Sequence, residues 1–250
     1  MGFRQLNILI LLAALLFVTS CKMLQQEPPP LPIISITFDD QHANVYSKAL
    51  PLMSIYGYRG SCFVNSHRLG RVGMLSQRDV TSLFNEYNWE IGGHSLNHEH
   101  LAELSYQEAE TAIGADYVNL SDLGVNPRSF AIPSGNCPQE YYPIITHFYK
   151  NVRGSSDFAM YDPVDRHSLG YFTFQSGWSA SIVIERIRRG IANRESLIVL
   201  GFHRIDGGEN EDYAQDNCPL SEFADILRYI NNLKLEVLPL AEAVDKLSCY

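Results

Sequence analysis

Two adjacent carboxylates, Asp39 and Asp40, end an apolar, β-branched run with the sequence Ile-Ile-Ser-Ile-Thr-Phe-Asp-Asp. Further along the chain, His94 and His98 stand four residues apart, and His203 ends a second apolar run. Two acids and three histidines at the ends of such runs are the side chains from which a metal-assisted hydrolase is built. The pattern therefore predicts a hydrolytic metal site.

The spacing of the histidines indicates how such a site would hold its ion. Residues four apart share one side of a helix or a helix-like turn, so His94 and His98 can bind one metal together. Asp40 is the best third ligand, and a set of two histidines and one carboxylate leaves positions open for water and substrate. Zinc is the expected ion, while cobalt, nickel, manganese and iron also accept these ligands. Two surface histidines on a helix are the alternative.

Asp39 and Asp40 have different predicted roles, since successive side chains of a strand point to opposite faces. With Asp40 on the metal, Asp39 is free to take a proton from the attacking water, unless the pair only caps a helix or forms a turn. His203 is the candidate acid that protonates the leaving group, because imidazole titrates near neutrality. A core histidine is the alternative for His203, and His42 could also reach the pocket.

Short apolar runs alternate with longer amphipathic runs from residue 33 onward. Strands are expected at 33–38, 61–65, 89–92, 129–132, 171–174, 197–202 and 235–238, and helices at 45–56, 77–87, 106–123, 139–148, 181–193, 220–233 and 241–247. This alternation predicts an α/β fold with a mostly parallel sheet and right-handed crossovers, and it favours a closed or distorted barrel. The chemical groups would then meet at the carboxyl-end rim of the strands.

The N-terminus has the proportions of a signal peptide, with Arg4 before an apolar run from Ile8 to Val18 that is too short to span a bilayer. The run leads to Val-Thr-Ser-Cys at 18–21, which resembles the lipobox of bacterial lipoproteins. By that resemblance residues 1–20 are removed and Cys21 carries the lipid that anchors the protein to a membrane. A plain secretory signal or an uncleaved anchor is the alternative. The proline-rich residues 21–32 are expected to form a tether, and residues 33–250 the folded domain.

The formal net charge of -9 argues against nucleic acid as a partner. Oligomeric state is not indicated by any pattern in the chain. Export places Cys62, Cys137, Cys218 and Cys249 where disulfides can form. Cys137 and Cys218 each follow a strand that carries a motif, which predicts a disulfide between them, whereas Cys62 is expected to be a buried free thiol.

These blocks, in this order, resemble the motifs of the polysaccharide deacetylase family, carbohydrate esterase family 4. Thr-Phe-Asp-Asp at 37–40 resembles the motif that supplies the base and a metal-binding aspartate, and His-Ser-Leu-Asn-His at 94–98 resembles the motif with the metal-binding histidines. Residues 130–135 match a third motif in outline, in which Ser134 would contribute its backbone N–H to an oxyanion hole, with Pro133 and Gly135 beside the substrate. Leu-Gly-Phe-His at 200–203 resembles the motif whose histidine is the acid.

The chain departs from the family pattern in two places. Ala131 stands where the typical third motif has an arginine that holds the base, and Arg128 and Arg153 are the candidates to replace it. The fourth motif is reduced to a region near Trp178, which could stack on a sugar ring, wall the acetyl pocket or belong to the core. The acids that could orient His203 are Asp157, Asp162 and Asp165.

The resemblance implies a distorted (β/α)7-type barrel with its active site at the carboxyl-end rim. It implies metal-dependent removal of acetyl groups, N-acetyl groups first, from an acetylated glycan of the cell envelope or the extracellular space. The enzyme would be lipid-anchored in the periplasm or at the outer membrane. The alternatives are hydrolysis of a non-sugar amide, an imide or an O-acetyl ester at the same site, and a catalytically silent glycan-binding lipoprotein.

Overall fold

The computed structural model describes residues 30–207 and 217–247. The chain divides into two units, Met1–Pro30 and Leu31–Tyr250, and the second contains the folded domain. The predicted signal peptide, the lipidation site Cys21, most of the tether and Cys249 lie outside the described residues. Within the described ranges, no helix is both long and apolar enough to cross a bilayer.

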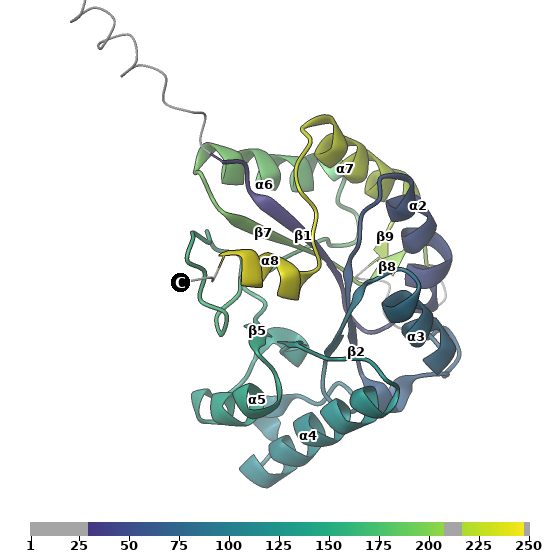
Figure 1. The fold of residues 1–250 in the computed structure, drawn as a ribbon, viewed down its shortest axis with the longest axis vertical. Coiled ribbons are helices and arrows are strands. Elements are labelled where there is room, and N and C mark those ends of the chain that lie inside the picture. The colour runs from purple at the N-terminus through teal and green to yellow at the C-terminus, as the bar shows by residue number, and fades with distance from the viewer. Residues whose placement is uncertain (1–29, 208–216, 248–250) are drawn as a thin grey trace, which may run out of the picture. The chain divides into compact units, whose positions relative to one another are not determined.

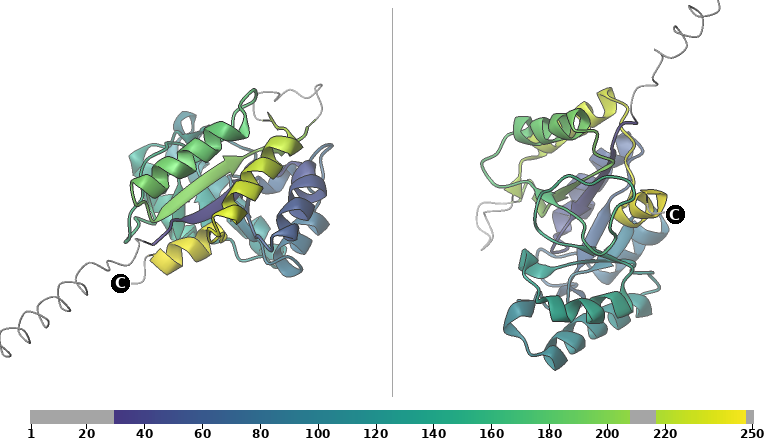
Figure 2. Two further views of the ribbon diagram at one scale, coloured as in Figure 1. Left: turned by 90° about the horizontal axis from the view of Figure 1, so that it is seen from above. Right: turned by 90° about the vertical axis from the view of Figure 1, so that its left-hand side faces the viewer.

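A parallel sheet of seven strands organises this unit, in the order β5-β4-β3-β2-β1-β7-β6. Its strands are β1 (Ile33–Phe38), β2 (Ser61–Val64), β3 (Glu90–Gly93), β4 (Ser129–Ala131), β5 (Asn151–Arg153), β6 (Phe172–Thr173) and β7 (Leu197–Phe202). β1 and β7 pair over their whole length, from Ile33 with Leu197 to Phe38 with Phe202. The sheet curls into a half-barrel with helices around it (Figures 1 and 2), which confirms the predicted distorted barrel.

The helices follow the strands as the hydrophobic pattern predicts. They are η1 (Val45–Ala49) continued by α2 (Leu50–Ile55), α3 (Gln77–Asn85), α4 (Tyr106–Asp122), α5 (Tyr142–Phe148), α6 (Ala180–Ala192), α7 (Leu220–Asn232) and α8 (Leu240–Leu247). Shorter turns of helix are η2 (Ser66–Arg68), η3 (Leu101–Glu103), η4 (Pro133–Gly135) and η5 (Gln139–Tyr141), and β8 (Arg204–Ile205) pairs with β9 (Asn217–Cys218). A capping box starts α4, where Ser105 and Glu108 satisfy each other's backbone N–H groups.

The two faces of β1 pack against different parts of the fold. Ile34, Ile36 and Phe38 belong to the large core that includes side chains of α2, α3, α6 and α7. Ile33 points the other way, into a smaller core that it shares with residues of α8. Figure 1 shows α8 inside the curve of the sheet and the other helices around the outside. Alternation along the strand therefore directs Asp39 into the half-barrel.

Two expectations about the fold are wrong, namely the strand at 235–238 and the disulfide between Cys137 and Cys218. Residues 235–238 form no strand, and only Val237 makes a bridge, with Ile34, before α8 begins at Leu240. β2 pairs with β1 only at Thr37 and Phe38, so this short segment lies along the part of β1 that β2 leaves open.

The expected disulfide is also absent, since Cys137 and Cys218 are both free, and Cys62 is a buried free thiol as predicted. Cys137 follows β4, whereas Cys218 lies on β9, beside the strand that follows β7. β4 and β7 are four positions apart in the sheet. At ~4.8 Å per strand that separation is roughly 19 Å, well beyond the reach of a disulfide.

Candidate metal centre and active site

Asp40, His94 and His98 converge at the carboxyl ends of β1 and β3. One ligand atom from each lies within 4.8 Å of the other two. Oδ1 of Asp40 lies 3.7 Å from Nε2 of His94 and 3.6 Å from Nε2 of His98. The same Oδ1 is buried and has no hydrogen-bond donor among the described residues, so an acceptor oxygen and two imidazole nitrogens face one point.

The histidines meet through a loop and not through a helix, so the expected helix-like turn is wrong. Ser95 and His98 have positive φ values of 63° and 65°. Glu99 holds this loop by accepting hydrogen bonds from the Ser95 hydroxyl at 2.6 Å and the Asn97 backbone N–H at 2.9 Å. The Asn65 side-chain amide donates to the carbonyl of Ser95 at 3.1 Å. Side chains outside any helix therefore set the positions of the two rings.

The protonation state of His94 suits a metal ligand. Its Nδ1 lies 2.8 Å from the carbonyl oxygen of Ala131, which can only accept, so Nδ1 carries the proton and Nε2 presents its lone pair. Burial lowers the pKa of His94 to about 4, although Asp39 and Asp40 oppose that change. A neutral imidazole with its free nitrogen toward Asp40 fits a divalent cation, and so does the mixed nitrogen and oxygen donor set.

Asp39 lies beside this centre but has a different partner. Nη2 of Arg153 lies 2.8 Å from Oδ1 and 2.7 Å from Oδ2 of Asp39, and both side chains are buried. Burial alone raises the pKa of Asp39, but the charge of Arg153 outweighs it, together with His94 and His203 in the protonated forms that they take at low pH, so the pKa lies below the usual value. The carboxylate is thus held ionised inside the half-barrel.

Arg153 occupies the place that the third motif leaves empty at Ala131. Ala131 on β4 and Arg153 on β5 are register partners, so their side chains leave the sheet on the same face. The Arg153 guanidinium also lies over the rings of Tyr171, at 3.8 Å, and Phe63, at 4.9 Å. The other candidate, Arg128, forms an ion pair with Asp245 instead.

The position of Asp40 depends on a turn that strand alternation does not predict. Asp40 has a φ of 66° and Gln41 a φ of 42°, both in the left-handed region. The Gln41 side chain anchors this turn, because its Oε1 accepts the backbone N–H of Asn65 at 2.7 Å. The chain therefore turns after Asp39, which leaves Asp39 with Arg153 and brings Asp40 to the histidines.

His203 follows β7 on the same rim, and its buried Nδ1 has no hydrogen-bond partner among the described residues. Its charge lowers the pKa of both Asp39 and Asp40, which places it near them. None of the described hydrogen bonds joins it to the acids expected to orient it. Asp157 forms ion pairs with Arg186 and Arg189, and an oxygen of Asp165 accepts the backbone N–H of His167.

His42 is buried near the acid pair. Burial lowers the pKa of His42 to about 4, against the opposing effect of Asp40. A backbone bridge joins His42 to Met74. At neutral pH its ring is uncharged and adds no positive charge to the site.

Ser134 lies in η4, the turn that follows β4, with a φ of 54° and an exposed side chain. Pro133 is buried, and Gly135 has a φ of 69° and leaves no space for a Cβ because Oγ of Ser155 lies 1.8 Å from that position. The turn is therefore fixed by its backbone and by Ser155.

Trp178 lies away from this turn, after β6. Its ring packs against Phe172 at 5.6 Å and Phe174 at 6.2 Å between centroids. It also lines a groove of about 420 Å³ along α6 with Ile182 and Arg189. The side chain is partly buried against the large core.

Asp116, on α4, is a part of the site that the sequence analysis missed. Its carboxylate accepts the backbone N–H of Ser66 at 2.8 Å and that of His94 at 3.1 Å. It is fully buried, and burial raises its pKa to about 7. A sequence signal existed, because Asp116 continues the apolar stripe of α4 formed by Ala109, Ala112, Ile113 and Leu120.

Comparison with known proteins agrees with this geometry. The model of the polysaccharide deacetylase family matches residues 26–147. The chain therefore carries a polysaccharide deacetylase domain. The match includes Asp39, Asp40, His94 and His98 but ends before β5, so it does not include Arg153 or His203. No curated protein matches the chain.

Solved structures of carbohydrate esterase family 4 share the fold of this deacetylase domain. A family pseudoenzyme from Bacillus anthracis is 14% identical, with a TM-score of 0.59, over 87% of this chain and 67% of that one. A family domain of a multidomain xylanase from the hindgut metagenome of Trinervitermes trinervoides is 18% identical, with a TM-score of 0.54, over 87% and 91%. A family 4 carbohydrate esterase from Streptomyces lividans, in complex with acetate, is 15% identical, with a TM-score of 0.57, over 82% and 91%.

Proposed function

We propose that the protein is a metal-dependent deacetylase that removes acetyl groups, N-acetyl groups first, from a polysaccharide of the cell envelope or the extracellular space. The observation that carries the proposal is the Asp39–Arg153 ion pair beside the cluster of Asp40, His94 and His98. A buried carboxylate held ionised next to a three-residue ligand set is the arrangement that hydrolysis by an activated water requires.

Each side chain has a role that its surroundings support. Asp40, His94 and His98 would hold a divalent cation, zinc first, and the cation would supply Lewis-acid activation of water and of the acyl oxygen. Asp39 takes the proton from water, because its carboxylate is ionised and able to accept one, and Arg153 fixes its orientation.

The remaining groups act on the acyl carbon and the leaving group. The Ser134 N–H supports the oxyanion from a turn fixed by its backbone, with Pro133 and Gly135 on either side. His203 gives a proton to the departing nitrogen or oxygen. Trp178 is proposed to contact the glycan, with the groove along α6 as its place of contact.

A silent glycan-binding protein is the competing class, and a pseudoenzyme shares this fold. The buried base and its arginine argue for the enzyme, because glycan binding has no use for an ionised carboxylate held below the surface. We further propose that the protein is exported and held at the envelope by a lipid on Cys21, as the apolar run and the lipobox-like sequence suggest.

The test is release of acetate from oligomers of N-acetylglucosamine by the purified chain with added zinc or cobalt. Asp39→Asn and His94→Ala are expected to abolish release, while His67→Ala, a change at an exposed histidine on η2, leaves it intact. Absence of release from a chain that binds metal stoichiometrically would overturn deacetylation of this glycan. Turnover of a small amide, an imide or an acetyl ester in that case would support the alternative hydrolase, and glycan binding without turnover the silent binder.

A further inference from the structure

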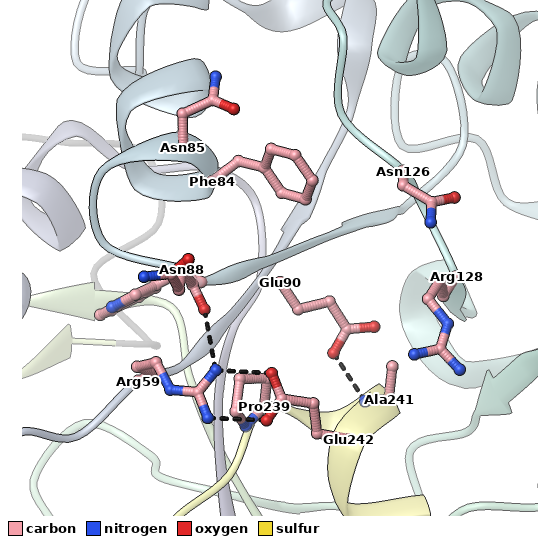
Figure 3. A pocket seen from close by; sticks show the side chains of 11 residues that line it. Arg59, Phe84, Asn85, Asn88, Glu90, Asn126, Arg128, Pro239, Ala241 and Glu242 are labelled. Atoms are coloured by element: carbon pink, nitrogen blue, oxygen red, sulfur yellow. Dashed lines mark hydrogen bonds and ion pairs between the residues drawn. The ribbon is translucent and has the colours of Figure 1, made fainter. Parts of the chain in front are cut away.

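A cavity of about 460 Å³ opens at the amino-terminal ends of β2, β3 and β4 (Figure 3). The residues that line it come just before these strands and from the start of α8, with Arg59, Asn88 and Arg128 among them. The candidate active site lies at the opposite edge of the sheet, at the carboxyl ends of the strands. The cavity has the size of a small-molecule site and no part in the proposed reaction.

Glu90, the first residue of β3, supplies the strongest signal for a ligand. Its side chain is buried at 8% exposure, and Oε2 accepts from the Ser61 hydroxyl and the Ala241 backbone N–H, each at 2.8 Å. Its Oε1 is buried and has no partner among the described residues. A buried carboxylate oxygen left without a donor is costly, so the cavity favours a ligand that brings a donor to Oε1.

The charges around the cavity are already paired. The two terminal nitrogens of Arg59 lie 2.6 and 2.7 Å from the two carboxylate oxygens of Glu242, and Arg128 pairs with Asp245. Figure 3 shows Glu90 between the Arg59–Glu242 pair and Arg128. Both arginines are already paired with an acid, so neither is available to bind an anionic ligand. The charges around the cavity therefore favour an uncharged ligand.

The rest of the lining suits a sugar ring. Asn85, Asn88 and Asn126 are exposed at the mouth and offer amide groups that both donate and accept. Phe84 and Trp89 add apolar surface to the same lining. Hydroxyl groups can donate to Oε1 and exchange hydrogen bonds with amides, while the C–H face of a pyranose packs on apolar side chains. From these contacts we infer that the cavity is a second binding site, for a neutral saccharide, separate from the candidate active site.

Trp89 provides a probe that reports on this cavity and not on the metal centre. The chain has two tryptophans, so Trp178→Phe leaves Trp89 as the only one. Tri-N-acetylchitotriose and maltotriose are titrated into this single-tryptophan chain without metal. A saturable change in Trp89 emission with one of them is expected, and Asn126→Ala or Glu90→Gln should weaken it at least fivefold. Asn232→Ala, which removes an exposed amide at the end of α7, should leave it unchanged.

Three results would overturn the inference. One is an unchanged Trp89 emission up to tens of millimolar of both sugars in a folded chain. The second is binding that survives Asn126→Ala and Glu90→Gln. The third is binding of phosphate or an organic ammonium ion but not of sugars. Asn126 is exposed, so its variant tests the site even if Glu90→Gln fails to fold. The assay needs neither metal nor turnover, so its failure and the failure of the proposed deacetylation are distinguishable.

Discussion

Arg153 on β5 donates hydrogen bonds to both carboxylate oxygens of Asp39. Its register partner on the neighbouring strand β4 is Ala131. The two residues of the ion pair are 114 positions apart in the chain, yet both are almost completely buried. A positioning group can thus move to the neighbouring strand without changing the face of the sheet from which it acts, because parallel register partners project alike.

Replacing Arg153 by Met should shift the pH profile of the reaction. Burial continues to raise the pKa of Asp39 when the positive charge is gone, so the base stays protonated to a higher pH. The acid limb of kcat/KM is expected to move upward in pH, and activity at neutral pH to fall by roughly 10²-fold. Arg188→Met, at an exposed arginine of α6, is the matched control and should leave the limb in place.

Moving the arginine from β5 to β4 tests this prediction more strictly. The double variant Ala131→Arg/Arg153→Ala places the guanidinium on β4 instead of β5. Part of the activity lost in Arg153→Ala should be restored. The acid limb of kcat/KM should lie at lower pH than in Arg153→Ala. If Arg153→Ala and the double variant have the same profile, Arg153 does not act through Asp39.

Metal binding should separate the two adjacent aspartates. Asp40→Ala and His98→Ala are each expected to abolish stoichiometric zinc binding, since each removes one of three converging ligand atoms. Asp39→Asn should retain the metal, because its carboxylate is engaged by Arg153. Calorimetric titration with zinc checks this, and equal loss in Asp39→Asn and Asp40→Ala would contradict the assignment.

Gly201 on β7 should tolerate no side chain. A Cβ at this position would lie 1.8 Å from the ring of Tyr171, which packs against the Arg153 guanidinium. Gly201→Ala is expected to lower the free energy of unfolding by about 1–3 kcal/mol, measured by urea denaturation. Gly154→Ala, where the nearest atom is 4.0 Å away, is the control and should unfold like the parent.

Glu90 should make stability depend on pH in a defined direction. Burial raises the pKa of Glu90 above the ordinary value of 4.5, despite its hydrogen bonds. Between the ordinary and the raised pKa the folded state holds a proton that the unfolded state has lost. The contribution of Glu90 is therefore full below pH 4.5 and declines as pH rises through the folded pKa.

Glu90→Gln stays neutral throughout, so its stability relative to the parent should increase with pH across that window. Urea denaturation at a series of pH values measures the difference. A difference that stays constant would show that the carboxyl titrates alike in the folded and unfolded chain.

The central strands could be predicted from the sequence because their runs are long and apolar on both faces. β1 and β7 have the predicted bounds, 33–38 and 197–202. β5 could not be predicted, since Asn151, Val152 and Arg153 carry no apolar pattern and become a strand by pairing with β4.

The candidate site, too, could be predicted only in part from the sequence. Strand ends and spacing placed Asp40, His94 and His98 together, because the carboxyl ends of parallel strands share one edge. The choice between Arg128 and Arg153 depends on which end of the sheet each side chain occupies. No local pattern reveals this, and none predicts the left-handed turns that orient the ligands.

Those left-handed turns bear on how the protein could be stabilised. Five non-glycine residues of the site have positive φ: Asp40, Gln41, Ser95, His98 and Ser134. Each side chain in that region costs roughly 1–2 kcal/mol relative to glycine. Glycine at Ser134 would relieve the cost and keep the N–H, but glycine at Asp40 or His98 would delete a ligand. Laboratory selection for thermal tolerance alone would therefore tend to replace these site residues first. Screens for more stable variants need to measure activity from the outset.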